Sequence, residues 1–139
     1  MSLNSLTALS PVDGRYASRC TELRELFSES GLVRARVRVE IAWLHALAAH
    51  PGIAEMQGLT KADLAAAASV AAGFVEADAA AVKAIELKTN HDVKAVEYFI
   101  KQQLGQHPAW LPQLEFVHFA CTSEDINNLS YGLMCLEAR

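Results

Sequence analysis

The 139-residue sequence has few residues that interrupt helices, with only 7 glycines and 4 prolines. Its longest nearly uncharged stretch, 64–75, is shorter than the roughly 20 apolar residues of a membrane-spanning helix. The 3 cysteines are an odd number at no metal-ligand spacing, and residues 1–9 lack the basic and apolar regions of a signal peptide. These absences predict no membrane span, no metal site, no disulfide framework and a cytoplasmic location.

Basic residues are also in the minority, since 12 lysines and arginines stand against 16 aspartates and glutamates. The net charge of −4 argues against a general binder of nucleic acid, although a few basic residues can still converge on one small anion. Apolar residues make up 52% of the chain and charged residues 20%, which excludes a disordered chain. What is abundant is alanine (24) and leucine (17), and both favour helices, so we expect an all-α fold.

The segment 33–41 is the one place where the local rules conflict. Apolar and charged residues alternate there, which is typical of a strand, yet Val33, Val37, Ile41 and Leu44 also share one helical stripe. No turn residue separates this segment from the strongly helical residues that follow. We therefore expect one helix over 32–50, ended by a Pro-Gly pair.

Further helices are expected at about 18–28, 60–73, 78–87, 93–104 and from 124 onward. Thr60 should begin one of them as the N-cap, with Asp63 in the place of the usual Glu of a capping box. The proline-rich stretch 108–112 separates a predicted N-terminal helical domain, 1–111, from a second domain that begins at 112–139.

The predicted last helix carries an apolar stripe at spacings of three and four residues, which is typical of a helical bundle: Ile126, Leu129, Leu133 and Leu136. No glycine, proline or cap follows this stripe before Arg139. We therefore expect a long helix that the chain cuts short and whose partners lie downstream.

Three polar clusters interrupt the helical pattern. In the first, 10–16, Arg15 offers a planar fork of donors for phosphate or carboxylate, and Tyr16 adds a hydroxyl and a ring face. In the second, 89–94, the side chains of Asn90, His91 and Asp92 gather at a predicted helix N-terminus, where backbone N–H groups favour anions. Ordinary explanations stay open for both, namely a surface turn and a helix cap.

The third cluster, 122–128, begins another predicted helix. Thr122 and Ser123 can bind a carboxylate with hydroxyl and main-chain donors together, although a hydroxyl before acidic residues is also how helices commonly start. Two adjacent asparagines within the helix suggest a buried polar contact or a ligand, because asparagine is a poor helix former. Cys121 beside His118 has no third partner for nucleophilic chemistry, and a buried structural cysteine is the simpler interpretation.

Taken together, the clusters resemble the adenylosuccinate lyase family in its bacterial long form, within the fumarase/aspartase superfamily. The matching stretches are SPVDGRY (10–16), TNHDVKAVEYF (89–99) and EFVHFACTSEDINN (115–128). The resemblance covers the whole chain but only about the first third of the family's length. It ends before the family's catalytic histidine and before the mobile Gly-Ser-Ser loop with its catalytic serine.

The resemblance implies an N-terminal helical domain followed by the start of a long-helix bundle, in a homotetramer whose active sites each draw on three subunits. It implies a lyase of purine biosynthesis that needs no cofactor. The reaction would be β-elimination of fumarate from adenylosuccinate, giving AMP, and from the succinyl-carboxamide imidazole ribotide, giving the carboxamide ribotide.

By the same resemblance, Arg15 and Tyr16 would contact the phosphate and ribose end of this nucleotide. Asn90, His91 and Asp92 would form a second binding segment, with His91 near the reaction centre as a helper in binding or protonation. Thr122 and Ser123 would hold the succinyl carboxylate. No catalytic residue is assigned within the chain itself, so we expect these 139 residues alone to be inactive.

Two alternatives remain open at this point. One is a non-catalytic helical interaction module, which the leucine stripe and the incomplete catalytic set favour. The other is a sister lyase, such as argininosuccinate lyase. The amino-acid sequences of the second and third motifs argue against it.

Overall fold

The computed structural model describes residues 4–139, and within that range the chain is all-α, as its composition predicts. The α-helices are α1 (Thr21–Phe27), α2 (Glu29–Ala49), α3 (Lys61–Ala72), α4 (Glu76–Thr89), α5 (Asp92–Leu104) and α6 (Ser123–Ala138). Three 3-10 helices accompany them, η1 (Ala17–Arg19), η2 (Ala54–Met56) and η3 (Pro108–Phe116). No strand occurs in the described part of the chain.

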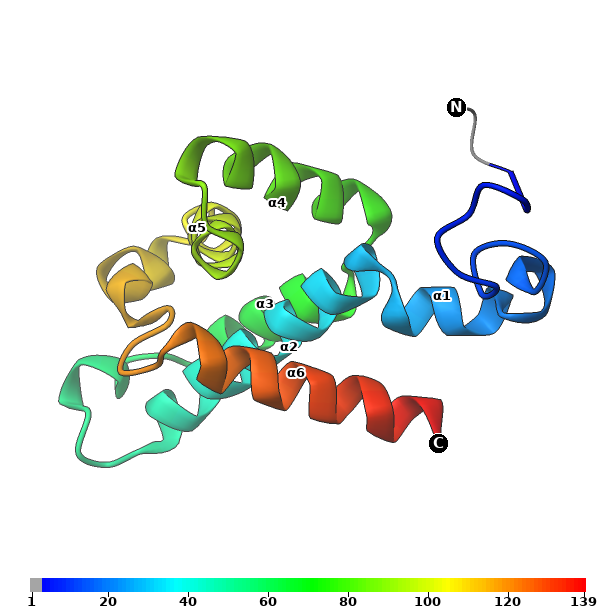
Figure 1. The fold of residues 1–139 in the computed structure, drawn as a ribbon. Helices are drawn as coiled ribbons and strands as arrows, with labels where there is room; N and C mark the ends of the chain where they lie inside the picture. The colour runs from blue at the N-terminus through cyan, green and yellow to red at the C-terminus, as the bar shows by residue number, and fades with distance from the viewer. Residues whose placement is uncertain (1–3) are drawn as a thin grey trace.

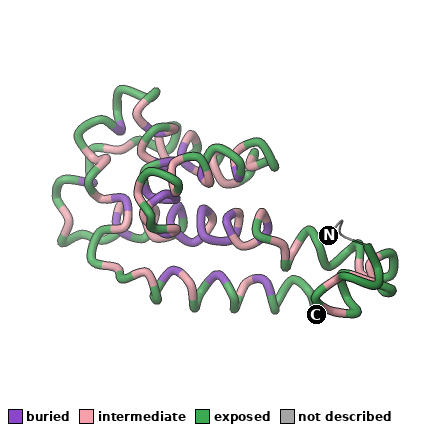
Figure 2. The backbone as a smooth tube through the Cα atoms, turned by 45° about the horizontal axis from the view of Figure 1, so that its top comes forward, coloured by how far each residue is buried: buried purple, intermediate pink, exposed green. Residues whose placement is uncertain are grey.

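Helix α2 is the centre of the fold, and it resolves the conflict between the strand and helix patterns. It contacts α1, α3, α4, α5 and α6, and Figure 1 shows α6 running alongside it. Because neighbours cover α2 on several sides, residues on more than one of its faces are buried, which Figure 2 shows as a nearly continuous buried stretch. The alternating sequence of 33–41 is therefore that of an enclosed helix, and the prediction of one continuous helix is confirmed.

The core lies mainly between α2 and α5. The predicted stripe of α5 is completely buried, and it consists of Val93, Val96, Ile100 and Leu104. Leu44 of α2 and Trp110 of η3 are buried in the same cluster as three of these residues. The Trp110 indole N–H donates to the carbonyl of Asp63 at 3.0 Å, so the largest core side chain also satisfies its polar atom.

Capping side chains set the ends of the helices. Thr60 and Asp63 form the predicted capping box at the start of α3, with the Asp63 N–H 3.2 Å from the Thr60 hydroxyl. Ser28 ends α1 and also caps α2, so α2 begins three residues earlier than the apolar pattern predicts. Gly31 makes this tight junction possible, since a Cβ there would lie 2.3 Å from the carbonyl oxygen of Leu26.

Helix α6 buries a different face from the one that its leucine spacing predicts. Its buried residues lie four apart: Ile126, Ser130 and Met134. This face packs on α2, and Ile126 joins Val39 of α2 and Val93 of α5 in a second core cluster. Leu129 and Leu136 are 61% and 66% exposed. The expectation that the helix has no partner within the chain is therefore wrong for one face, whereas part of the leucine stripe is uncovered.

No individual helix in residues 4–139 has the length and apolar character needed to cross a membrane. The pair α3 and α4 passes that test jointly by length and composition, but the two helices are bent by 89° at their junction.

Candidate functional site

The junction between α4 and α5 holds the second polar cluster in a fixed shape. Asn90 ends α4 in a left-handed conformation, with φ of 51°, which asparagine tolerates better than most residues. His91 then caps α5, and its Nδ1 accepts a hydrogen bond from the N–H of Lys94 at 3.2 Å. An Nδ1 that accepts leaves Nε2 as the N–H donor of the neutral ring. His91 is therefore the residue that caps the helix after the junction, and Asn90 ends the helix before it.

Asp92, the first residue of α5, is paired with an arginine of α2. The Arg36 guanidinium donates from Nη2 to Asp92 Oδ2 at 2.7 Å. Partial burial alone would raise the pKa of Asp92, but the Val93 N–H and the Arg36 charge outweigh burial and hold this pKa below its usual value. Asp92 is therefore a carboxylate fixed by a buried cation at the start of a helix.

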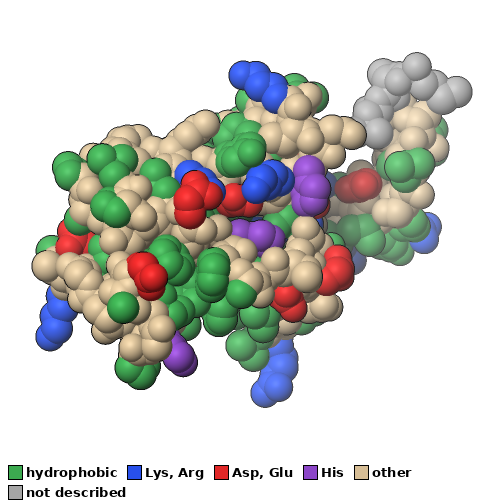
Figure 3. All heavy atoms as spheres, turned by 90° about the vertical axis from the view of Figure 1, so that its left-hand side faces the viewer, with side chains coloured by type: hydrophobic (Ala, Val, Ile, Leu, Met, Phe, Trp, Pro, Cys, Tyr) green, Lys and Arg blue, Asp and Glu red, His purple; other side chains and the backbone are tan. Residues whose placement is uncertain are grey.

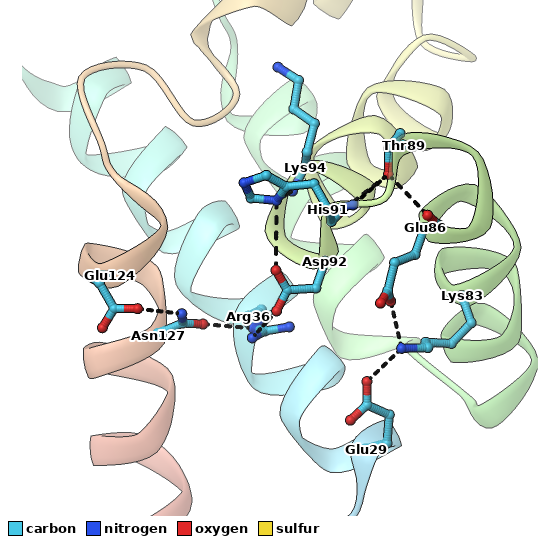
Figure 4. Close-up of polar contacts among 10 residues, drawn as sticks. All are labelled: Glu29, Arg36, Lys83, Glu86, Thr89, His91, Asp92, Lys94, Glu124 and Asn127. Atoms are coloured by element: carbon cyan, nitrogen blue, oxygen red, sulfur yellow. Dashed lines mark hydrogen bonds and ion pairs between the residues drawn. The ribbon is translucent and has the colours of Figure 1, made fainter.

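The same arginine joins the second cluster to the third. Arg36 Nε donates to Asn127 Oδ1 of α6 at 2.9 Å, and Asn127 Nδ2 donates to Glu124 Oε1 at 3.0 Å. Figure 4 shows Arg36 between Asp92 and Asn127, with the three residues coming from three helices. Asn127 thus makes the polar contact that an asparagine pair within a helix suggests. The N-terminal turns of α5 and α6 are tied together through one side chain that is 4% exposed.

Thr122 caps α6 in a capping box with Asp125. The Thr122 N–H donates to Asp125 Oδ2 at 2.7 Å, and the Asp125 N–H donates to the Thr122 hydroxyl at 3.4 Å. The hydrogen bonds from Thr122 hold the pKa of Asp125 below its usual value. The ordinary explanation for this motif, a helix cap, is therefore correct for the Thr122 side chain. Ser123, the next residue, is half-buried in the first turn of α6.

The second cluster opens into a polar hollow of about 490 Å³ between α2, the α4–α5 junction and α6. Arg36, Asn90, His91 and Asp92 line it, together with Tyr131 of α6. On the face that Figure 3 shows, histidine, basic and acidic side chains gather in a band between apolar areas. The hollow combines donors, acceptors and a helix N-terminus, which suits an anionic ligand with further polar groups.

The first cluster lies elsewhere in the chain. Residues 10–16 belong to an N-terminal arm beyond α1, at the end of the molecule opposite to the α4–α5 junction (Figure 1). Arg15 and Tyr16 are exposed, and the guanidinium carbon lies 4.7 Å from the centre of the Tyr16 ring. The structure thus brings the second and third clusters together within one chain and leaves the first cluster, 10–16, apart from them.

Two buried carboxylates and Arg36 were missed by the sequence analysis. Glu40 on α2 is completely buried and lies 2.6 Å from His118 Nδ1. Glu97 on α5 is 4% exposed and forms ion pairs with Lys94 and Lys101. The sequence pattern does not set Arg36 and Glu40 apart, because Arg34 and Arg38 lie equally close to the apolar stripe of α2. Among the described residues, no group of three His, Cys, Asp or Glu side chains is placed to hold a metal ion.

Known proteins are similar to this chain along its whole length. A family model described as "Lyase" matches residues 14–139. The adenylosuccinate lyase of Escherichia coli (strain K12) is 52% identical over 139 residues, which cover 100% of this chain and 30% of that protein. The adenylosuccinate lyase of Vibrio cholerae is 53% identical over the same share of both chains. That of Legionella pneumophila (strain Corby) is 43% identical over 138 residues, with 99% and 30% covered.

The chain spans 30% of the length of these curated relatives. The resemblance that the motifs indicate is confirmed by relatives that match along all 139 residues. Since the family model covers residues 14–139, this protein belongs to the lyase family, and its relatives there include adenylosuccinate lyases.

Proposed function

We propose that the chain is the N-terminal part of a cytoplasmic adenylosuccinate lyase. The observation that carries this proposal is the 52% identity to the Escherichia coli adenylosuccinate lyase along the whole chain. The two tethered helix N-termini support it independently, because they offer an anionic substrate several main-chain and side-chain donors in one place. We also propose that residues 1–111 form an N-terminal helical domain and that residues 112–139 begin a second domain.

The reaction is a β-elimination. A base removes a proton from the succinyl carbon that lies next to a carboxylate, and this carboxylate gains negative charge as an aci-carboxylate. The C–N bond then breaks, and an acid protonates the departing nitrogen, which leaves fumarate and AMP. The parallel substrate, the succinyl-carboxamide imidazole ribotide, gives fumarate and the carboxamide ribotide. Donors aimed at the charge that develops contribute most to such a reaction.

Each cluster takes a role in this scheme. Thr122 and Ser123 lie at the start of α6 and offer hydroxyl and main-chain donors to the succinyl carboxylate. The hydroxyl and the main-chain N–H of Thr122 both serve the capping box with Asp125, so the role of Thr122 falls to the helix end that it caps. Asn90, His91 and Asp92 bind the substrate from the polar hollow, and His91 assists binding or protonation through Nε2.

Arg15 and Tyr16 bind the phosphate and ribose end of the nucleotide. Since the arm that carries them lies at the far end of the molecule from the other clusters, a second subunit supplies them to each site. This requirement supports the homo-oligomer, a tetramer, that the family resemblance implies. The base and acid of the elimination come from residues outside these 139.

The test is fumarate release, followed by ultraviolet absorbance and by chromatography of AMP. We expect the full-length protein that contains this chain to release equal amounts of both from adenylosuccinate and nothing from argininosuccinate. The 139-residue chain alone should release neither product, because it lacks the groups for proton transfer. Turnover of argininosuccinate instead would point to the sister lyase. Inactivity of the full-length protein on both substrates would point to the interaction module.

A further inference from the structure

Glu40 is a buried carboxylate whose one hydrogen-bonded partner in the described residues is a histidine. Its side chain is 0% exposed, and its Oε1 lies 2.6 Å from His118 Nδ1. Its Oε2 is buried without a hydrogen-bond partner. Burial raises the pKa of the Glu40 carboxyl, and the His118 hydrogen bond opposes this rise. Burying a carboxylate costs free energy unless the carboxylate is paired. The hydrogen bond with His118 offsets part of this cost for Glu40.

The partner of Glu40 lies in a strained turn. His118 and Ala120 both adopt left-handed backbone conformations, with φ of 64° and 58°, although neither is glycine. Such conformations are unfavourable for residues with a Cβ and persist where the surroundings hold them. Helix α2 supplies a second hold, because the Trp43 indole N–H donates to the carbonyl of Phe119 at 2.8 Å. Glu40 and Trp43 are one helical turn apart on α2. Together they hydrogen-bond to two consecutive residues of the 117–121 segment, His118 and Phe119.

This turn leads directly into Thr122 and Ser123. The Cys121 N–H donates to the His118 carbonyl at 3.3 Å, and Thr122 then caps α6. Arg36, one turn earlier on α2, holds α6 through Asn127. Helix α2 therefore holds both α6 and the 117–121 turn before it, through Arg36, Glu40 and Trp43.

We propose that Glu40 is a positioning residue, which acts through His118 to fix the 117–121 turn and thereby the place where Thr122 and Ser123 meet the substrate carboxylate. The proposal rests on the proposed function, in which these two residues hold the succinyl end. Loss of the Glu40–His118 contact should let the strained turn relax and displace the first donors of α6. A displacement of about 1 Å in a substrate-positioning group can cost a hundredfold in rate.

The first experiment compares Glu40→Gln with Glu97→Gln in the full-length protein. Glu97 is a matched control, because it is also a buried carboxylate but pairs with lysines of its own helix. We expect Glu40→Gln to lower kcat for adenylosuccinate by about tenfold to a hundredfold. Inhibition by AMP should change less than about twofold, because AMP lacks the succinyl group that the displaced donors hold. Glu97→Gln should leave kcat near the wild-type value.

A second variant changes the less buried partner of the contact, His118. His118→Asn keeps a residue that tolerates the left-handed backbone, and its side chain is too short to reach Glu40. If the pair acts as one unit, His118→Asn and the double variant should each lose about as much kcat as Glu40→Gln alone. Amide exchange of residues 119–123 should accelerate in every variant of the pair and not in Glu97→Gln. This exchange readout needs no activity and stands even if Glu40→Gln is too unstable for kinetics.

Several results would overturn the proposal. Normal kcat in Glu40→Gln with unchanged exchange at 119–123 would show that the contact positions nothing. Equal losses in Glu40→Gln and Glu97→Gln would show a general effect of the core, and additive losses in the double variant would show independent roles. A wild-type protein that releases no fumarate would instead refute the proposed function, and the exchange experiment would still decide whether Glu40 holds the turn.

Discussion

Arg36 has the largest structural role of any single side chain in the candidate site. It is nearly completely buried, and its two hydrogen bonds reach α5 and α6 from the central helix. A planar guanidinium suits this task, because its donors point in fixed directions toward two different acceptors. One side chain therefore links the second cluster to the third, in addition to the apolar packing of Val39, Val93 and Ile126.

We expect Arg36→Met to lower the free energy of unfolding by about 2–3 kcal/mol, because two hydrogen bonds that involve a charged group are lost. Arg38→Met is the control, since Arg38 is also on α2 but makes a half-exposed ion pair with Glu137. Surface ion pairs contribute about 0–1 kcal/mol, so this variant should be nearly as stable as the wild type. Urea unfolding of both variants measures the difference. Equal losses would show that Arg36 does not join the two clusters.

Asp92 should make the stability depend on pH in a defined direction. Its pKa is lower in the folded chain than the unfolded value of about 3.9, so its contribution is complete above that value. The contribution disappears as the pH falls through the folded pKa. We expect Asp92→Asn to be less stable than the wild type at pH 7, by at most about 1 kcal/mol because the carboxylate is 45% exposed. The two proteins should converge as the pH falls through the folded pKa of Asp92, and a gap that widened toward low pH would contradict this assignment.

Sequence reasoning at this scale identified the residues that break a pattern and missed those that fit within one. Asn90, His91 and Thr122 stand out because they interrupt helices, and the structure shows each of them as a cap. Arg36 and Glu40 sit inside a long helix among other charged residues. Only the packing of α5 and of the 117–121 turn against α2 distinguishes them from less buried neighbours such as Arg34.

At the scale of elements, caps and periodicity predicted the helices well. The Thr60 capping box and the stop at Gly73 set α3 as expected, and the stripe of α5 is completely buried. The buried face of α6 could not be read from leucine spacing. Its contact with α2 uses Ile126 with the smaller Ser130 and the flexible Met134, whose hydropathy is less conspicuous than that of leucine. Which face of an amphipathic helix is covered depends on the neighbours that the fold supplies.

The uncovered leucines of α6 should make the 139-residue chain self-associate. Leu129 and Leu133 line an apolar groove of about 560 Å³ between α6 and α2, and exposed apolar patches of this kind favour association. We expect Leu129→Gln combined with Leu136→Gln to shift the chain to a monomer in sedimentation experiments. Leu87→Gln, which changes an 89% exposed leucine of α4, serves as the control and should change nothing. A wild-type chain that is monomeric at every concentration would contradict this expectation.

At the scale of the whole molecule, the separation of the clusters implies a division of labour along the substrate. The arm with Arg15 would hold the phosphate end, which does not react, whereas the start of α6 would hold the carboxylate that gains charge. An interaction that is equally strong in ground and transition states affects KM, and one that strengthens in the transition state affects kcat.

In the full-length protein, we therefore expect Arg15→Ala to raise KM for adenylosuccinate about tenfold or more with little change in kcat. Ser123→Ala should instead lower kcat by about tenfold or more, because in the proposed function its hydroxyl would serve the developing aci-carboxylate. Steady-state kinetics of the two variants decide the point. If Ser123→Ala raised KM and left kcat untouched, Ser123 would not lie at the reacting end.

The sequence predicted three clusters of one site, and their distribution over the molecule needed the structure. Nothing in the spacing of residues 10–16, 89–94 and 122–128 shows that the first lies on an arm beyond α1. The central claim is that the first cluster and the other two meet only between subunits.

Mixing two defective variants tests this claim most directly. Full-length Arg15→Ala and Ser123→Ala are unfolded together, refolded as hybrids, and assayed for fumarate release at a substrate concentration below KM. If the two residues reach a site from different subunits, some hybrid sites contain both intact side chains, and we expect the mixture to be more active than either variant refolded alone. If one chain supplied both residues to the same site, every site would carry a defect. A mixture no more active than the mean of its two parents would therefore contradict the account.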